Sequence, residues 1–409
     1  MKSIGIEKIN LYGCSLYLDQ FKLAEARGKE LGSGTTAYLI QQRSLNPPYE
    51  DAITMGANAA IGLLSEEDKC NIGMLIVGTE SSPDFGKPMS TNIHKALDLP
   101  QNVRNYETKH ACYSGVAALD TAINWLASGL NHGKKALVIS TDFSREHLGN
   151  KEEFIMGGVA TALLLSDEPR ILEYELDKRG TWTVDIYDTF RPSAREERGN
   201  SDLSLYSYLD ALEGAYVDYV SKSDRNTDFR SHFNAITYHT PFPGMTFQAH
   251  RTLCNTNGLK NKSDVKESFA KMVVPSLHYV SRVGSTYGSS NFVGLCSLIK
   301  CLDTLQAGDR IGFFSYGSGS IGEFYSGLIC PEAKENLSHL HIDEELDRRR
   351  EVTVEEYEAI ERTRDGYVEN PNFTPDFSLP HHWYEEHYKG KGYLVLKQVK
   401  DFRRIYERS

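Results

Sequence analysis

The sequence has no long apolar run and few cysteines, and both shortages narrow the kinds of protein it can encode. No stretch approaches the roughly 20 apolar residues of a membrane-spanning helix, and the start of the chain lacks the apolar segment of a secretory signal peptide. The seven cysteines are odd in number and include no Cys-x-x-Cys pair. That pattern argues against a disulfide framework or a structural zinc site. We therefore expect a cytoplasmic protein with free thiols, no metal and no membrane partner.

Positive charge is also in short supply. Lys and Arg number 45 against 56 Asp and Glu, which gives a formal net charge of −11. So acidic a chain is a poor general binder of nucleic acid. Apolar residues, in contrast, make up 40% of the chain, enough for a large core. The length of 409 residues suits two or three domains, or one body built from a duplicated half.

Short apolar runs alternate with helix-like segments in the first third of the chain. Ala52–Leu64 and Ala117–Leu130 have helical spacing. Three runs are typical of buried strands, namely Gly73–Thr79, Ala136–Thr141 and Gly158–Leu165. Buried strands that alternate with helices predict an α/β architecture with helices covering a sheet.

The same alternation returns in the second half. An exposed strand pair (Ile171–Leu176 and Thr181–Tyr187) comes first. The later segments are a helix at Ser204–Lys222, strands at Ala235–Tyr238, Ile311–Tyr316 and Ile321–Ile329, and a buried helix at Asn291–Leu302. We therefore expect two similar α/β halves. The predicted division is 1–169, then 170–330 with an intervening excursion at 170–232, then a charged, proline-broken C-terminal appendage at 331–409.

Cys112 is the first candidate for chemistry. It precedes the apolar helix within Lys109–Gly115, where the helix dipole and free backbone N–H groups favour a thiolate. Its small neighbours Ala111, Ser114 and Gly115 leave room for a substrate. The alternative interpretation is an inert cysteine of the core.

Two further candidates follow apolar strands. His239 opens a Pro/Gly turn, at a place where α/β sheets put functional side chains, and Glu80 could act as a general base with a raised pKa. Taken singly, His239 could be a structural histidine and Glu80 a solvated loop carboxylate. A thiol, an imidazole and a carboxylate at strand–helix junctions together suit carbon–carbon bond chemistry on thioesters.

The Gly-rich stretch Phe314–Ser320 could bring backbone N–H groups close to a thioester oxygen, or could be an ordinary tight turn. It matches neither the phosphate-loop pattern nor a strand-linked GxGxxG motif. The histidines at His339–His341 and His381–His382 lack a full set of metal ligands, so we interpret them as surface residues.

These residues resemble the 3-hydroxy-3-methylglutaryl (HMG) synthase family of the thiolase superfamily, over the whole chain to about Ile329. Four motifs carry the resemblance: Gly78–Ser81, Ala111–Gly115, His239–Phe242 and Phe314–Gly319. The resemblance implies a five-layered αβαβα thiolase-like fold built from two similar halves, with the C-terminal appendage added. It also implies that Glu80 is the general base, Cys112 the acylated nucleophile and His239 the acid that orients the substrate. The N–H groups of Cys112 and Ser318 would form the oxyanion hole.

Details favour one branch of the family. Synthases of the mevalonate pathway usually carry a lysine where Gly244 stands, and the run that continues to Arg251 is closer to the polyketide β-branching synthases, which act on acyl carrier proteins. Ser285 stands where the family typically has an asparagine that is thought to contact the acceptor thioester. The substrate-binding residues implied by the resemblance are Tyr113, Ser114, Pro241, Gly244, His250, Ser285, Tyr316 and Gly317.

The implied activity is that of an acyltransferase that forms a carbon–carbon bond. An acetyl group on Cys112 would undergo aldol-type addition to the β-ketone of a carrier-protein-bound β-ketoacyl thioester, giving an HMG-type intermediate for polyketide β-branching. The implied partners are a donor acetyl-acyl carrier protein (or acetyl-CoA), an acceptor β-ketoacyl-acyl carrier protein and a second copy of the chain. No cofactor would be bound beyond the phosphopantetheine of the substrates.

Carrier proteins are generally acidic, so docking on this chain requires a local basic patch. The hypothesised patch consists of Arg27, Lys29, Arg251 and Lys262, which could equally be scattered solvated charges. Three other functions remain open at this point. They are a coenzyme A-dependent synthase of the mevalonate pathway, a ketosynthase of the chalcone or fatty-acid-initiation type, and a non-catalytic carrier-protein scaffold.

Overall fold

A single mixed sheet of nine strands runs through the protein, in the order β11-β12-β13-β8-β1-β7-β6-β4-β5. The structure, a computed structural model, describes residues 3–29, 39–145, 148–223 and 228–409. The strands are β1 (Gly5–Tyr12), β4 (Ile72–Gly78), β5 (Arg104–Thr108), β6 (Lys135–Phe143), β7 (Gly158–Ser166), β8 (Leu172–Thr183), β11 (Ala235–Tyr238), β12 (Arg310–Gly317) and β13 (Ile321–Ile329).

The two ends of this sheet repeat one pairing pattern. In the N-terminal half, β4 runs parallel to β6, β6 antiparallel to β7, and β7 antiparallel to β1. In the C-terminal half, β11 runs parallel to β12, β12 antiparallel to β13, and β13 antiparallel to β8. The halves meet where β1 pairs with β8, with Gly5 opposite Glu173. The prediction of two similar α/β halves is therefore confirmed.

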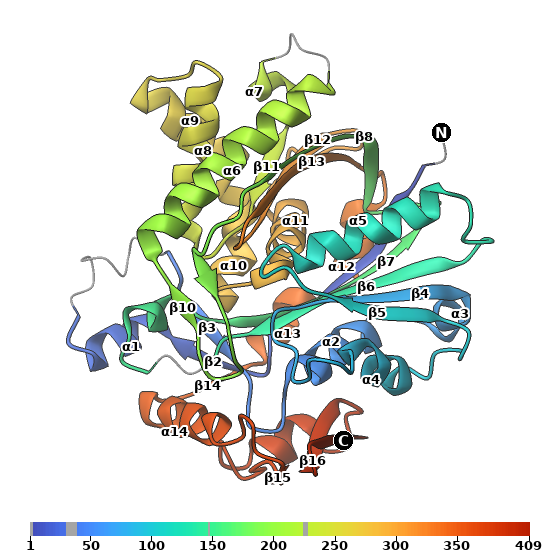
Figure 1. The fold of residues 1–409 in the computed structure, drawn as a ribbon, viewed down its shortest axis with the longest axis vertical. Helices are drawn as coiled ribbons and strands as arrows, with labels where there is room; N and C mark the ends of the chain where they lie inside the picture. The colour runs from blue at the N-terminus through green and yellow to red at the C-terminus, as the bar shows by residue number, and fades with distance from the viewer. Residues whose placement is uncertain (1–2, 30–38, 146–147, 224–227) are drawn as a thin grey trace.

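Helices cover the sheet in layers (Figure 1). The central layer holds α5 (Ser114–Ala127) and α11 (Ser290–Cys301), whose apolar residues share one core cluster with strands of both halves. On the outer faces, α2 (Ala52–Ile61) and α4 (Met89–Ala96) cover the N-terminal half, and α6 (Ser201–Ser221) and α8 (Pro243–Thr256) cover the C-terminal half. This is the predicted five-layered αβαβα arrangement.

The central helix α5 lies where it does because glycines remove side chains at its start. A Cβ on Gly78 would lie 2.4 Å from the carbonyl oxygen of Ser114, and a Cβ on Gly115 would lie 2.3 Å from that of Gly288. Such distances are far inside van der Waals contact, so any larger residue would displace the helix. Gly115 therefore serves backbone packing, whereas the sequence suggested that it makes room for a substrate.

The middle of the chain differs from the expected strand pair. Leu172–Thr183 forms one long strand, β8, which pairs with β13 along its length and with β1 at its beginning. Its first four residues alternate in burial and its last three are exposed, which is why the sequence resembled a pair of exposed strands. The chain then forms a small hairpin of β9 (Thr189–Phe190) and β10 (Arg198–Gly199) before α6 begins.

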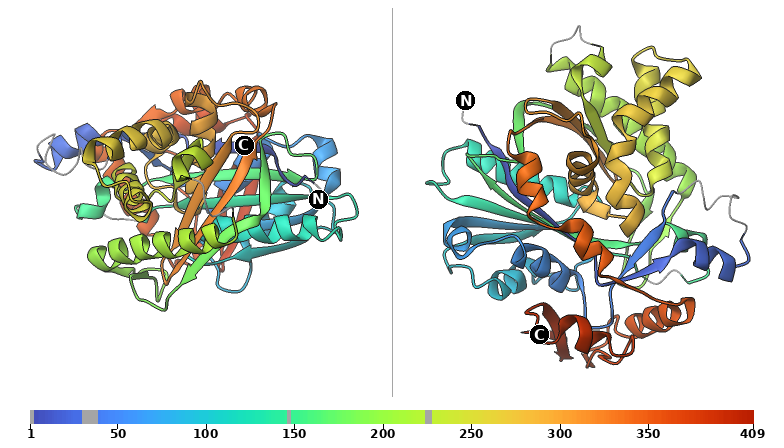
Figure 2. Two further views of the ribbon diagram at one scale, coloured as in Figure 1. Left: turned by 90° about the horizontal axis from the view of Figure 1, so that it is seen from above. Right: turned by 180° about the vertical axis from the view of Figure 1, so that it is seen from behind.

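The C-terminal segment packs against the N-terminal half (Figure 2). Its elements are α12 (Ala333–Ser338), α13 (Ile342–Asp347), β14 (Arg350–Glu351), α14 (Val354–Asp365), β15 (Asn372–Phe373), β16 (Leu394–Lys400) and β17 (Arg403–Arg408). Strand β14 joins a small sheet with β2 (Leu16–Asp19) and β3 (Gln42–Leu45), and β15, β16 and β17 form another. Apolar residues of both regions share one core cluster.

The remaining helices are short. They are α1 (Gln20–Ala26), α3 (Glu66–Asn71), α7 (Phe229–His232), α9 (Lys262–Met272) and α10 (His278–Val283). Within the described ranges, no helix combines the length and the apolar character that crossing a membrane requires.

Candidate active site

The predicted catalytic residues lie at equivalent places in the two halves. Glu80 follows β4, His239 follows β11, and Cys112 lies in the turn before α5. The parallel strand pairs β4–β6 and β11–β12 carry the first two residues to carboxyl ends of the sheet. Two carboxylates, Glu80 and Asp142, interact electrostatically with the Cys112 thiol, so the turn and the strand ends share one site.

The turn around Cys112 is tight. The N–H of Tyr113 donates to the carbonyl of His110 (3.0 Å), and the N–H of Ser114 donates to that of Ala111 (3.2 Å). Ala111 has a positive φ of 42°, a conformation that costs energy in a residue with a Cβ. Cys112 itself is partly buried and forms no disulfide.

Cys112 is a neutral thiol at rest, contrary to the thiolate that its helix-start position suggested. Burial, followed by the charges of Glu80 and Asp142, raises the pKa of the Cys112 thiol well above its ordinary value. A helix N-terminus stabilises a negative charge by only about 0.3–1 kcal/mol at an ordinary site, and burial beside two carboxylates outweighs it. Acylation must therefore move the thiol proton to a base.

Asp142, on β6, is a site residue that the sequence reasoning missed. Its Oδ1 accepts hydrogen bonds from the Glu80 N–H (2.8 Å), the Ser81 hydroxyl (2.8 Å) and the Thr79 hydroxyl (3.0 Å). The residue is fully buried, and burial together with the neighbouring Glu80 raises the pKa of Asp142 to about 7. Burial also raises the pKa of Glu80, against the opposing charge of Arg191. The two carboxyl groups thus form a buried acid pair beside the thiol.

His239 is buried and neutral. Its backbone N–H donates to the carbonyl of Phe314 (2.6 Å), and its Nδ1 lies 3.1 Å from the Ser290 hydroxyl. Burial lowers the pKa of His239 to about 3. The Ser290 hydroxyl also lies 2.9 Å from the carbonyl of Tyr287, so Nδ1 and that carbonyl compete for its one proton. In the tautomer that has the ring proton on Nε2, His239 can donate that proton to a ketone oxygen. His239 can therefore orient a substrate by hydrogen bonding but carries no positive charge at rest.

The Gly-rich turn lies against the nucleophile turn. A Cβ on Gly317 would lie 2.5 Å from the carbonyl oxygen of His110 and 2.6 Å from the Cβ of Tyr113, so only glycine fits there. Ser318 is the next residue after Gly317, so it lies beside this contact between the two turns. The arrangement brings the two turns together, and the shared oxyanion hole of Cys112 and Ser318 stays a prediction.

A second carboxylate that the sequence reasoning missed holds the Gly-rich turn. Asp188 is fully buried, and its Oδ1 accepts a hydrogen bond from the N–H of Gly319 (2.9 Å). Its Oδ2 accepts from the hydroxyl of Tyr316 (2.7 Å). The only sequence signal was a polar residue beside aromatic ones in an irregular stretch, and such a signal does not reveal a partner about 130 residues away.

The predicted substrate-binding residues occupy different environments. The ring of Tyr316 lies 6.4 Å from that of His239, and Gly244 lies in the first turn of α8, three residues after the partly buried Pro241. Ser285 is buried, and its N–H donates to the carbonyl of Ile155 (3.1 Å). These residues surround the ends of β11 and β12 or, for Ser285, the segment that precedes β7.

Three of the predicted substrate-binding residues, Tyr113, Ser114 and His250, are engaged in packing or hydrogen bonds within the protein. The hydroxyl of Tyr113 donates to Glu323 between the two halves, and Ser114 is fully buried at the packed start of α5. Both ring nitrogens of His250 are engaged, Nδ1 with the Tyr238 hydroxyl (3.0 Å) and Nε2 with the Ser268 hydroxyl (2.8 Å). That is the environment of a structural histidine, and it gives no support to a substrate contact at His250.

The hypothesised docking residues lie on two separate parts of the surface. Arg27 and Lys29 follow α1, whereas Arg251 is on α8 and Lys262 begins α9, and Figure 1 shows α1 well below α8 and α9. Arg27 forms ion pairs with the buried Glu153 and with Glu358, both at 2.8 Å. Its charge is therefore neutralised internally. Lys29, Arg251 and Lys262 are exposed.

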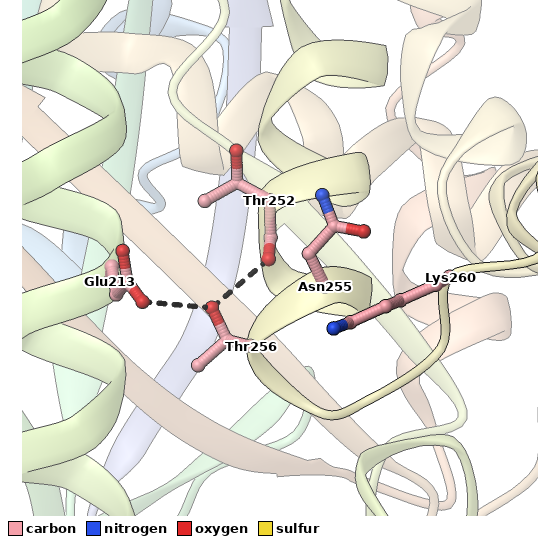
Figure 3. Close-up of a pocket in the computed structure, with 5 residues that line it drawn as sticks. All are labelled: Glu213, Thr252, Asn255, Thr256 and Lys260. Atoms are coloured by element: carbon pink, nitrogen blue, oxygen red, sulfur yellow. Dashed lines mark hydrogen bonds between the residues drawn. The ribbon is translucent and has the colours of Figure 1, made fainter.

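A polar surface pocket lies between α6 and α8 (Figure 3). The Thr256 hydroxyl in it donates to the carbonyl of Thr252 (3.0 Å) and lies 3.4 Å from Glu213. Its lining residues are Glu213, Thr252, Asn255, Thr256 and Lys260, none of which belongs to the predicted site. Among the described residues, no group of three or more His, Cys, Asp or Glu side chains is placed to hold a metal ion.

Comparisons with known proteins agree with this architecture. The family model described as "Hydroxymethylglutaryl-coenzyme A synthase N terminal" matches residues 1–169, and the model described as "Hydroxymethylglutaryl-coenzyme A synthase C terminal" matches residues 245–409. The polyketide biosynthesis 3-hydroxy-3-methylglutaryl-ACP synthase PksG of Bacillus subtilis (strain 168) is 38% identical over 373 residues, covering 88% of each chain. A hydroxymethylglutaryl-CoA synthase of Enterococcus faecalis is 34% identical over 366 residues, covering 88% of this chain and 91% of its own.

A solved structure extends the likeness to the whole fold. The crystal structure of the curacin biosynthetic pathway HMG synthase in complex with acetyl donor-ACP matches with a TM-score of 0.94 at 38% identity, and the match covers 100% of both chains. Both family models and these relatives place the chain among enzymes that join acyl groups through a new carbon–carbon bond. The chain belongs to the hydroxymethylglutaryl-coenzyme A synthase family.

Proposed function

We propose that this enzyme condenses an acetyl group with the β-ketone of a carrier-protein-bound β-ketoacyl thioester, giving an HMG-type intermediate for polyketide β-branching. The observation that carries the proposal is the placement of the Cys112 thiol beside the Glu80 carboxylate, in a chain similar over its whole length to an HMG synthase crystallised with acetyl donor-ACP. The 38% identity to PksG, a polyketide biosynthesis HMG-ACP synthase, supports the same branch.

The first step is acetyl transfer to Cys112. Because the resting thiol is neutral, its proton passes to the buried pair of Glu80 and Asp142 as sulfur attacks the acetyl carbonyl. The carbon–sulfur bond to the donor breaks, and the phosphopantetheine thiol leaves with a proton. The product is an acetyl thioester on Cys112.

The second step makes the carbon–carbon bond. Glu80 removes a proton from the acetyl methyl group, and the N–H groups of Cys112 and Ser318 stabilise the resulting enolate oxygen. Nε2–H of His239 hydrogen-bonds the β-ketone of the acceptor while the enolate carbon adds to the ketone carbon. The ketone oxygen becomes a hydroxyl by taking the His239 proton, and the proton that Glu80 removed from the methyl group replaces it. Water then hydrolyses the thioester and releases the product carboxylate and the free Cys112 thiol.

The substrates bring their own phosphopantetheine, and the proposed mechanism uses no bound cofactor or metal. A homodimer fits the exposed edge of the sheet. Strand β5 (Arg104–Thr108) has β4 as its one neighbour in the described part of the chain, and a free edge of this kind pairs readily with another strand. For the acidic carrier proteins, Lys29 or the pair of Arg251 and Lys262 supplies the positive charge.

Intact-protein mass spectrometry tests the proposal. The enzyme is incubated with acetylated carrier protein or with acetyl-CoA, and Cys112→Ser is the control. We expect one acetyl adduct from the carrier protein that is absent in the control, followed by an HMG-type product on an acceptor carrier protein. Acetylation by acetyl-CoA alone would replace the carrier-protein assignment with a coenzyme A-dependent synthase. Failure of both donors would favour the ketosynthase or the scaffold.

A further inference from the structure

The hairpin of β9 and β10 brings an arginine to the proposed base across more than 100 residues of sequence. Nη1 of Arg191 donates to the backbone carbonyl of Glu80 (3.2 Å), and Nη2 lies 3.8 Å from Glu80 Oε1. Nε of Arg191 donates to Oε2 of Glu197 on the same hairpin (2.5 Å). The side chains of Arg191 and Glu80 are only 16% and 17% exposed. Glu197 is more exposed, at 29% of its side chain. Charge interactions between the partly buried Arg191 and Glu80 are stronger than at an open surface.

These contacts fix Glu80 at both ends of its backbone. Oδ1 of Asp142 holds its N–H from β6 (2.8 Å), and Arg191 holds its carbonyl from the hairpin. The carboxylate itself is left nearly free, because 3.8 Å exceeds hydrogen-bonding distance. With Nε and Nη1 engaged elsewhere, Arg191 meets the carboxylate through Nη2 alone, without the parallel bonds of a bidentate pair.

This geometry suits a general base. A bidentate arginine would occupy both carboxylate oxygens and hold them away from a substrate methyl group, whereas a distant guanidinium favours the ionised form and leaves the lone pairs available. Glu197 contributes by taking the strongest hydrogen bond of Arg191 and thereby fixing the orientation of the guanidinium.

We propose that Arg191, anchored by Glu197, is a positioning residue that fixes the backbone of Glu80 and favours its ionised carboxylate without occupying the oxygens that accept the methyl proton. The proposal rests on the role of Glu80 as the base in the proposed function. Neither Arg191 nor Glu197 was singled out by the sequence motifs.

The charges around Glu80 come from several elements. Arg191 and Glu197 face it from the hairpin, Arg145 from the loop after β6, and Asp142 from β6 itself. The Cys112 thiol and the buried Tyr287 hydroxyl complete the surroundings from the turn before α5 and from the 3₁₀ turn before α11, and His239 is neutral. Burial and Glu197 raise the pKa of Glu80, while Arg191 and Arg145 lower it. Neutralising Arg191 or Glu197 should therefore act in opposite directions.

Arg191→Gln and Glu197→Gln form a matched pair, since each removes one charge and keeps a hydrogen-bonding side chain. The enzyme is first acetylated on Cys112, and condensation with an acceptor carrier protein is then followed from pH 5 to 9. For Arg191→Gln we expect the acid limb of the rate profile to move up by about one pH unit, so that the rate on the acid side of the limb falls about tenfold. For Glu197→Gln we expect the acid limb to move down. Arg191→Lys, which keeps the charge, should restore most of the limb position.

The control is the final extent of Cys112 acetylation, measured by intact mass, which shows that each variant is folded and accepts the donor. Shifts in the same direction, or no shift, in acetylated variants would overturn the proposal. If Arg191→Gln fails to fold, an unshifted Glu197→Gln profile overturns it alone. A Glu80→Gln variant distinguishes failure of the Arg191 proposal from failure of the proposed function. If that variant still condenses, the role of Glu80 in the proposed function fails, whatever Arg191 does.

Discussion

Removing the Asp142 carboxyl group should destabilise the protein and change the chemistry of Cys112 by separable amounts. In Asp142→Ala, the Glu80 N–H and the Ser81 hydroxyl lose their acceptor inside the core, whereas Thr79 keeps the carbonyl of Thr141 at 2.8 Å. Each buried donor without a partner costs about 1–3 kcal/mol, so the expected loss for the two donors is about 2–6 kcal/mol. That is a large part of the roughly 5–15 kcal/mol that stabilises a folded protein.

Asp142→Asn should cost less, because its amide oxygen can accept the bonds that Oδ1 accepts. The amide nitrogen would stand in place of Oδ2, a buried atom with no hydrogen-bond partner among the described residues, at a cost of about 1–2 kcal/mol. Both variants remove a negative charge beside Cys112 and should lower the pKa of its thiol, which Asp142 helps to raise.

Two assays check these expectations. Urea unfolding gives the free energies of unfolding, and the pH dependence of Cys112 alkylation by iodoacetamide gives the pKa of the thiol, because the thiolate is the reactive form. Wild type gives the reference pH dependence of alkylation, and Cys112→Ser gives the background alkylation of the other cysteines. The reasoning would be refuted if Asp142→Asn lost as much stability as Asp142→Ala, or if alkylation of Asp142→Asn followed the wild-type pH dependence.

Three further predictions concern Tyr113, Glu50 and Arg27. Tyr113→Phe leaves the buried Glu323 without its donor and should lower the free energy of unfolding by about 1–3 kcal/mol, measured by urea titration, whereas an unchanged value would contradict the role of this bond. Burial raises the pKa of Glu50 from 4.5 to about 7, so the native state binds this proton more tightly than the unfolded chain and stability falls as pH rises through that window. Glu50→Gln should remove that fall, roughly 3 kcal/mol, from unfolding curves at pH 4.5 to 8, and an equal fall in the variant would count against it. Arg27→Glu would place a negative charge against the fully buried carboxylate of Glu153 and should destabilise the fold by about 3–5 kcal/mol. Lys29→Glu should unfold like wild type. It is therefore the better charge reversal for a test of carrier-protein binding.

Regular elements and the motif residues were predictable because their signals are local. Helical spacing at Ala117–Leu130 and the apolar run at Gly158–Leu165 led to α5 and β7 with only small differences at their ends. Repetition of one strand–helix pattern led to the two halves, because each half must bury a sheet between helices. Cys112, Glu80 and His239 were singled out for the same reason, since each adjoins a recognisable strand or helix, and their catalytic roles stay predictions.

The sequence misjudged features that depend on neighbours. Half of β8 resembled an exposed strand, and only its pairing with β13 and β1 makes it one long strand of the central sheet. His250 stood in a motif but is enclosed by Tyr238 and Ser268. Cys112 had the local features of a thiolate, but burial, followed by the carboxylates at the ends of two strands, raises the pKa of its thiol.

The sequence by itself determined the layered α/β architecture, its duplication and the three residues on which the proposed chemistry depends. Only the tertiary structure decided which charges surround those residues. The partners of Glu80 are Asp142, 62 residues away, and Arg191, 111 residues away, and the Gly-rich turn is held by Asp188, 131 residues before Gly319. The physical reason is that periodicity and turn signals act within a few residues of the chain, whereas burial and electrostatic interactions depend on distance in space.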